Sequence, residues 1–247
     1  MTQRRRTALV TGAGRNIGRA CVLGLARDGF DVVINGSADR DACEAVRREA
    51  EDLGAAGLVA MGDVGRPEEC ARIAAAAIAR FGAVDVLVNN AALRPAAPFL
   101  EMGEDAWRRV MAVDLDAAVW LARACLPGMV ERGWGRIVNF TGMNAMHGYA
   151  GHAPVSVAKH GVWGLTKALA KEFGPRGITV NAISPGPIAA DDDDAFATTR
   201  RRDAVARIPV GRLGTPAEVA AVLRMLASDG GAFVNGQMLQ VNGGGQT

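Results

Sequence analysis

Short runs of apolar and β-branched residues alternate along the chain with longer stretches in which apolar residues recur at helical spacing. The stretches Ala71–Phe81 and Gly161–Phe173 are clear examples of the helical pattern. The short runs predict strands at Thr7–Thr11, Asp31–Asn35, Leu58–Met61, Val84–Asn89, Arg136–Thr141, Ile178–Ile183 and Gln237–Val241. This alternation predicts an α/β fold, a doubly wound parallel sheet of about seven strands with helices on both faces. No linker, repeat or second apolar unit interrupts it, so residues 1–247 are expected to form a single domain.

Composition and charge narrow the class of function. The formal net charge is only +2, and no run of Lys or Arg is longer than the triplets Arg4–Arg6 and Arg200–Arg202, which argues against a nucleic-acid partner. No stretch approaches the roughly 18 apolar residues of a membrane span, and the apolar run after the basic N terminus is too short for a signal peptide. We therefore expect a cytoplasmic protein without a membrane partner.

The 4 cysteines are widely spaced along the chain and fall in helical segments, at Cys21, Cys43, Cys70 and Cys125. Such spacing supports neither a metal site nor a redox pair, so buried reduced thiols are expected. Residues 189–202 break the regular pattern, because Asp191–Asp194 are consecutive acids that repel one another and favour a mobile loop on the substrate side. A metal site is the alternative for these carboxylates, and the lack of an anchoring histidine argues against it.

A glycine-rich turn follows the first strand, with the sequence Thr11-Gly12-Ala13-Gly14-Arg15-Asn16-Ile17-Gly18, and a helical pattern begins there. Such a turn brings backbone N–H groups and a helix N terminus up to a pyrophosphate, as in a Rossmann domain. With Asp63-Val64, Asn89-Asn90-Ala91-Ala92, Pro185-Gly186 and Asn242-Gly243-Gly244, the chain resembles the short-chain dehydrogenase/reductase family over nearly its whole length. Asn16 replaces the middle glycine of the motif, a mild departure because Asn tolerates left-handed backbone angles.

The resemblance implies a dinucleotide cofactor and a set of residues that bind it. These residues are Gly12, Gly14, Arg15, Asn16, Ile17, Gly18, Ser37, Asp63, Val64, Asn90, Ala91, Lys159, Pro185, Gly186 and Ile188. An acid at the end of the second strand would select NAD(H), but Gly36 stands there and is followed by Ser37. Arg15 and Arg40 lie nearby and suit a 2′-phosphate, so NADP(H) is favoured over NAD(H).

The nicotinamide end departs from the family pattern. Family members use Asn, Ser, Tyr and Lys there, and the corresponding positions hold Asp114, Gly142, Val155 and Lys159. Ala190 replaces the threonine that usually follows Pro-Gly. A positioned acid such as the missing tyrosine contributes roughly 10² to 10⁴ in rate, so ordinary alcohol dehydrogenation by the family mechanism is not expected. Lys159 retains a role as a clamp on the nicotinamide ribose.

Other residues are candidates for the missing proton transfer. Asp114 is expected either to pair with Lys159 or to act as an acid or base when desolvated. His147, Tyr149 and His152 lie on the loop before the Lys159 helix, where family members line the substrate pocket, and exposed loop positions are the alternative for each. Gly142, Asn144 and Val155 are expected to line the substrate pocket.

Three functions remain open at this stage. The first is an atypical NADP(H)-dependent reductase of an activated C=N, C=C or C=O bond of a small molecule. The second is a lyase, dehydratase or isomerase on the same scaffold, and the third is an inactive NADP(H)-binding subunit or partner. The resemblance also implies a homo-oligomer, commonly a tetramer, with Val162, Trp163 and Leu165 either at an interface or in the core.

Overall fold

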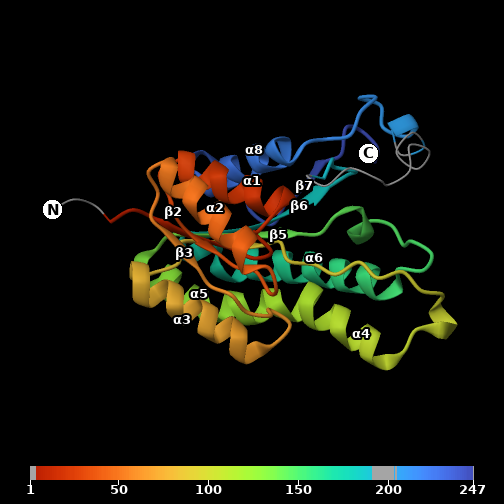
Figure 1. The fold of residues 1–247 in the computed structure, drawn as a ribbon, viewed down its shortest axis with the longest axis horizontal. Coiled ribbons are helices and arrows are strands. Elements are labelled where there is room, and N and C mark those ends of the chain that lie inside the picture. The colour runs from red at the N-terminus through yellow and green to blue at the C-terminus, as the bar shows by residue number, and fades with distance from the viewer. Residues whose placement is uncertain (1–3, 191–202, 204, 247) are drawn as a thin grey trace.

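Strands and helices alternate through the computed structural model, which describes residues 4–190, 203 and 205–246. The strands are β1 (Thr7–Val10), β2 (Asp31–Ile34), β3 (Gly57–Val59), β4 (Val86–Asn89), β5 (Gly135–Phe140), β6 (Ile178–Pro185) and β7 (Met238–Val241). All neighbours pair in parallel, in the order β3-β2-β1-β4-β5-β6-β7 (Figure 1). The predicted fold class is confirmed, and each predicted strand overlaps an observed one.

Helices cover both faces of this sheet. They are α1 (Asn16–Arg27), α2 (Arg40–Asp52), α3 (Pro67–Phe81), α4 (Glu104–Met111), α5 (Ala117–Arg132), α6 (Ala153–Phe173) and α8 (Pro216–Ala227). Figure 1 shows α1, α2 and α8 on one side and α3, α5 and α6 on the other. Side chains alternate along each strand, so Ala8 and Val10 of β1 join one apolar layer while Leu9 joins the other.

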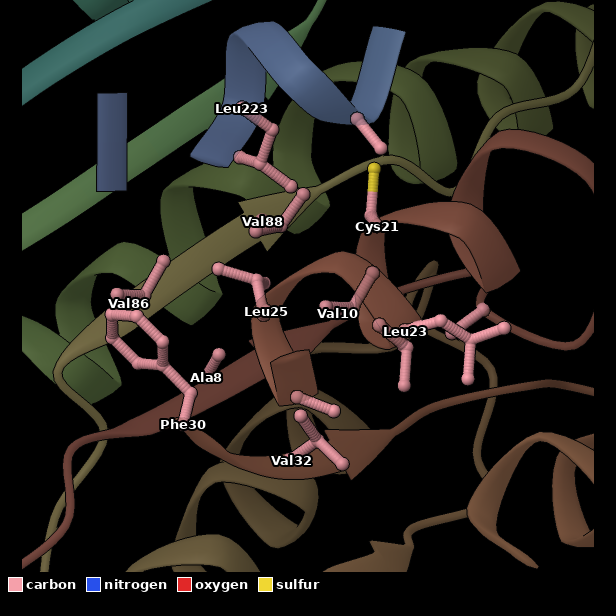
Figure 2. Packing of buried hydrophobic residues seen from close by; sticks show 14 of the residues in the cluster. Ala8, Val10, Cys21, Leu23, Leu25, Phe30, Val32, Val86, Val88 and Leu223 are labelled. Atoms are coloured by element: carbon pink, nitrogen blue, oxygen red, sulfur yellow. The ribbon is translucent and has the colours of Figure 1, made fainter. Parts of the chain in front are cut away.

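The layer beneath α1 and α8 shows how these helices are held. Figure 2 shows Cys21 and Leu25 of α1 and Leu223 of α8 close to Val10 and Val88 of the central strands. All these side chains are essentially inaccessible to solvent, which removes apolar surface from water and fixes the glycine turn that begins α1.

The cysteines have the predicted environment. All four are free and buried. Burial raises the pKa of the Cys70 thiol to about 11 and that of Cys125 to about 12, so both remain protonated and unreactive at neutral pH.

The order of the strands places a binding crevice at β1. The sheet grows in one direction from β1 to β2 and β3, and in the other through β4 to β7. The connections leaving β1 and β4 therefore diverge, and a crevice opens outside their carboxyl ends.

Membrane spans and clusters of metal-ligating side chains are both absent from the described residues. No helix among them is long and apolar enough to cross a membrane. Within the same part of the chain, no group of three or more His, Cys, Asp or Glu side chains is placed to hold a metal ion. The acidic run Asp191–Asp194, with most of the predicted loop 189–202, lies outside the described residues, so its role stays a prediction.

Candidate active site and cofactor cleft

A cleft of about 620 Å³ opens at the crevice beside β1. Most of the predicted dinucleotide-binding residues line it: Gly12, Gly14, Arg15, Asn16, Ile17, Gly18, Ser37, Asp63, Val64, Asn90 and Ala91. Its volume lies within the range of small-molecule and cofactor sites in proteins. The structure therefore brings together residues that are up to about 80 positions apart in the sequence.

The backbone of the glycine turn requires its particular residues. Gly12 has φ of +60°, and Asn16, at +49°, is the only non-glycine residue of the described chain with positive φ. A Cβ at Gly18 would collide with the carbonyl oxygen of Gly12. Asparagine thus occupies a left-handed position that glycine usually fills, as predicted from the motif.

The first turn of α1 suits an anion. This helix begins at Asn16 without a side-chain cap, and no acidic residue occurs in its first turn. The positive end of the helix dipole and its first N–H groups face the cleft, which is the arrangement that binds a pyrophosphate. The residues present therefore fit a dinucleotide.

The residues that follow β4 hold the glycine turn in place through hydrogen bonds. The Asn90 side-chain amide donates to the carbonyl oxygens of Thr11 at 2.9 Å and of Gly12 at 3.0 Å. In return, the Thr11 hydroxyl accepts the backbone N–H groups of Asn90 and Ala91. Asn90 thus shapes the glycine turn through hydrogen bonds to its backbone, in addition to lining the cleft.

Asp63 is held by Arg109, a residue of the same cleft that no sequence motif marks. Arg109 of α4 forms a fork with both carboxylate oxygens of Asp63, at 3.0 and 2.9 Å. Burial opposes ionisation of Asp63, but Arg109 and the N–H of Gly65 outweigh it, and the net effect lowers the pKa of this carboxyl. The absence of a side chain at Gly65 leaves room for the guanidinium.

The end of β2 carries no acid at the position that selects the ribose. Gly36 and Ser37 line the cleft there. Asp39 caps α2 by accepting the N–H of Ala42 at 2.9 Å. Arg40 begins that helix and lies 3.6 Å from Glu44, with 60% of its side chain exposed.

The residues after β6 lie apart from the described cleft. Pro185 ends the strand, the Gly186 N–H donates to the Val241 carbonyl at 2.9 Å, and Ile188 forms a bridge with Gly214. None of these is among the residues that line the 620 Å³ cleft. Their assignment to the cofactor stays a prediction.

Lys159 and Asp114 form a buried ion pair. The Lys159 ammonium lies 3.3 Å from Asp114 Oδ2 and donates to the Phe140 carbonyl oxygen at 3.0 Å. Only 5% of the Lys159 side chain and 0% of the Asp114 side chain are exposed. Burial lowers the pKa of Lys159, the Asp114 carboxylate opposes this shift, and the nearby charge of Arg94 adds to it.

The pair faces a small cavity rather than the main cleft. This cavity has a volume of only about 10 Å³, and Thr11 and Asn89 contribute further polar groups to its lining. Space of this size holds about one water molecule, so a substrate cannot occupy it. Lys159 is not among the residues that line the main cleft.

Asp114, which pairs with Lys159, lies where the chain leaves regular α-helical geometry. Residues Ala112–Asp116 form a π-helical turn between α4 and α5. Asp114 Oδ1 also accepts the backbone N–H of Leu93 at 2.6 Å, so one carboxylate joins the loop after β4 to the helix that carries Lys159. Single π turns of this kind occur frequently at functional sites.

Val155 and Gly142 stand at the positions where the family resemblance predicts catalytic hydroxyls, and neither offers another group for proton transfer. Val155 is 2% exposed and does not line the cleft. Gly142 has φ of +77°, a conformation in which serine would be strained. Asn144 is half-buried in the 3-10 turn Met143–Ala145, also outside the cleft lining.

The remaining candidates lie on the loop between β5 and α6, as predicted. His147 and Tyr149 are exposed, and His152 is half-buried at the start of α6. The Tyr149 hydroxyl accepts a hydrogen bond from the Gln246 side-chain amide at 3.2 Å. Among the described residues, no hydrogen bond or ion pair joins any of these three side chains to Lys159 or Asp114.

Sequence and structure comparisons agree with this architecture. Residues 12–246 match the family described as "Enoyl-(Acyl carrier protein) reductase". Nodulation protein G of Azospirillum brasilense is 40% identical over 237 residues, which is 96% of each chain. The chain belongs to the short-chain dehydrogenase/reductase family.

Other members of this family support the oxidoreductase class. The 3-oxoacyl-(acyl-carrier-protein) reductase FabG of Vibrio cholerae is 37% identical over 239 residues, covering 97% of this chain and 96% of its own. A candidate NAD(P)-dependent gluconate 5-dehydrogenase from Beutenbergia cavernae, solved with NADP at low occupancy, has a TM-score of 0.90 and 40% identity, covering 98% and 96% of the two chains. The protein is thus an oxidoreductase of the short-chain dehydrogenase/reductase type.

Proposed function

We propose that the protein is an atypical NADP(H)-dependent oxidoreductase that reduces an activated C=N, C=C or C=O bond of a small molecule without a tyrosine acid. One observation carries the proposal. The glycine turn and its helix are complete, whereas Val155 is buried at the tyrosine position and Lys159 is held by Asp114.

The preference for NADP(H) rests on charge at the end of β2. Gly36 and Ser37 carry no carboxylate, and Asp39, which lines the cleft farther on, uses one carboxylate oxygen to cap α2. Arg15 lines the cleft, and Arg40 at the start of α2 is largely exposed. A guanidinium forms charge-assisted hydrogen bonds with a 2′-phosphate, so these residues favour the phosphorylated cofactor. The NADP present in the Beutenbergia relative is consistent with this preference.

The reduced nicotinamide supplies a hydride, and the protein contributes binding and electrostatics. In this proposal Lys159 is not the partner of an acid, and it acts as a clamp on the cofactor ribose only where the ribose reaches its buried ammonium, which does not line the main cleft. Its charge is balanced by Asp114, because the two groups are buried together. The substrate must therefore bring its own proton, as a protonated imine does, or take one from water, His147, Tyr149 or His152.

The test measures hydride transfer directly. Purified protein is incubated with NADPH deuterated at C4 and a panel of cyclic imines, enones and ketones, and the products are analysed by mass spectrometry. We expect deuterium in a product from the imines or enones, and no turnover of simple ketones. NADPH that binds but transfers no deuterium to any compound of the panel would contradict the proposal. Binding of NADH as tight as that of NADPH would contradict the cofactor preference alone.

A second candidate is an NADP(H)-binding subunit without activity. The positive φ of Gly142 and the burial of Val155 favour it, since both hydroxyl positions are lost together. Tight NADPH binding without turnover, together with co-purification of an active relative, would distinguish this candidate. Product formation without cofactor oxidation would instead identify a lyase, dehydratase or isomerase that uses Asp114 or the loop residues.

The proposal extends to a cytoplasmic homo-oligomer, a tetramer, that has no nucleic-acid or membrane partner. Trp120 of α5 and Val157 of α6 are exposed apolar side chains that suit an interface between copies. Val162 is 2% exposed and belongs to the core, so it does not take part in such an interface. Light scattering coupled to size-exclusion chromatography measures the assembly, and a monomer would contradict it.

A further inference from the structure

The loop after β4 carries an arginine, Arg94, that has no hydrogen-bonding or ionic partner within residues 4–190, 203 and 205–246. Arg94 is an exposed residue that lines the main cleft. Across the part of the chain that the structure describes, its guanidinium makes neither a hydrogen bond nor an ion pair. Arg109, which lines the same cleft, is by contrast held in a fork by Asp63. Arg94 is therefore available to a ligand, whereas Arg109 is already neutralised.

Arg94 lies on the part of the cleft wall that is next to the buried Lys159–Asp114 pair. The residue before it, Leu93, donates its N–H to Asp114 Oδ1 at 2.6 Å, and the other oxygen of Asp114 lies 3.3 Å from the Lys159 ammonium. The charge of Arg94 is near enough to contribute to the lowered pKa of Lys159. Arg94 therefore follows directly after Leu93, the residue that Asp114 holds, and it lines the main cleft.

The loop that carries Arg94 is fixed at both ends. Asp114 holds Leu93, and the N–H of Ala97 donates to the Gly151 carbonyl at 3.0 Å. Pro95 follows Arg94 and restricts the backbone between these anchors. A fixed backbone lowers the entropy that a side chain loses when it binds a ligand.

Arg94 and Lys159 differ in whether a carboxylate of the described residues neutralises their charge. Asp114 cancels the charge of Lys159, and neither side chain is accessible. A guanidinium carries a permanent charge and presents a fork of donors that matches the two oxygens of a carboxylate or phosphate. A neutral substrate would leave this charge without a counterpart, so an anion gains most from the site.

We propose that Arg94 binds a carboxylate of the substrate at the nicotinamide end of the cleft. The substrate class is then a small organic acid whose reducible bond lies near its carboxylate. This inference rests on the proposed function, because it places the reacting bond beside the cofactor. It assigns a specificity-determining role to a cleft residue that was not among the predicted cofactor-binding residues.

Anion binding tests the inference before any substrate is known. Malonate, malonamide and inorganic phosphate are titrated calorimetrically into the full-length protein saturated with NADP⁺, at constant ionic strength. The variants are Arg94→Gln, which removes the charge, and Arg94→Lys, which keeps it without the fork. Arg108→Gln is the matched control, because Arg108 is exposed on α4, pairs with Glu104 and does not line the cleft.

We expect malonate to bind the parent protein and Arg108→Gln alike, and malonamide to bind neither. Loss of a charge-assisted fork weakens binding about tenfold or more, so Arg94→Gln should show at least this loss and Arg94→Lys a smaller one. Malonate that binds Arg94→Gln as tightly as the parent, or that fails to bind the parent, overturns the inference. Phosphate that binds tighter than malonate overturns the choice of a carboxylate and assigns the site to a phosphorylated substrate.

The two proposals can fail separately. If NADP⁺ does not bind, the proposed function fails, and the same malonate titration of the cofactor-free protein still decides the role of Arg94. If NADP⁺ binds equally to the parent and Arg94→Gln while malonate binding does not depend on Arg94, the proposed function stands and this inference falls.

Discussion

Replacement of Asp114 by asparagine tests how much the buried Asp114–Lys159 ion pair contributes to the stability of the protein. Asparagine keeps the shape of the side chain and an oxygen that can accept the Leu93 N–H, but it removes the charge opposite Lys159. At 3.3 Å and an effective dielectric constant of about 20, the lost attraction amounts to roughly 5 kcal/mol. Lys159 recovers part of this by releasing its proton, at about 1.4 kcal/mol per pH unit. We therefore expect the free energy of unfolding to fall by about 2–4 kcal/mol at pH 7.

The pH dependence of this loss follows from the pKa of Lys159. Burial already lowers that pKa below its unfolded value of 10.5, so the folded state binds fewer protons than the unfolded state in this window and stability rises with pH there. Without Asp114 the folded pKa falls further, and the variant releases its proton at a lower pH than the parent. The deficit of Asp114→Asn relative to the parent should therefore shrink as the pH rises from 7 towards 10.5.

Urea denaturation followed by circular dichroism, repeated between pH 7 and 10, measures both effects. Asp116→Asn is the matched control, because Asp116 is exposed at the end of the same π-helical turn and should change stability by less than about 0.5 kcal/mol. The electrostatic reasoning would be refuted by an Asp114→Asn variant that loses no more stability than Asp116→Asn. A deficit that stays constant with pH would show that packing, and not charge, is responsible.

Three further substitutions test other parts of the structure. Val155→Tyr should lower the free energy of unfolding by about 1–3 kcal/mol without raising ketone reduction, because the site is buried; gain of ketone reduction would contradict the buried geometry. Asp85→Asn should lower the free energy of unfolding, measured by urea titration, by about 2–3 kcal/mol. Asp85 is 3% exposed and accepts hydrogen bonds from two arginines and a backbone N–H. The control Asp28→Asn, at an exposed position, should lower it by less than about 1 kcal/mol. Gly65→Ala should weaken NADPH binding about three- to tenfold in a fluorescence titration, because a Cβ there collides with the Arg109 guanidinium; unchanged affinity would show that Arg109 has no part in binding.

Much of the scaffold and the phosphate end of the cleft were predictable from the chain. Strand positions follow from short apolar runs, and the glycine turn from residues that are adjacent in the sequence. Asn16 shows how far such local reasoning extends: its tolerance of positive φ predicts its place in the turn, and its φ of +49° agrees. Local backbone preferences act within a few residues, so the sequence displays them directly.

The site residues that the sequence did not reveal depend on contacts between distant segments. Arg109 of α4 binds Asp63, which lies in the loop between β3 and α3, and no spacing rule links the two positions. Arg94 is one of many arginines in the chain, and only its place on the cleft wall sets it apart. A π-helical turn at Ala112–Asp116 has no simple sequence pattern, yet it contains Asp114, which pairs with Lys159.

The sequence by itself determined the parallel α/β fold and the glycine turn, because hydrophobic periodicity and backbone preferences are local properties. Tertiary structure alone decided that Val155 is buried, that Lys159 is neutralised by Asp114 and that Arg94 has no such counterpart among the described residues. Charge balance in a site depends on distances and on exclusion of water. Both are set only when helices and strands pack against one another.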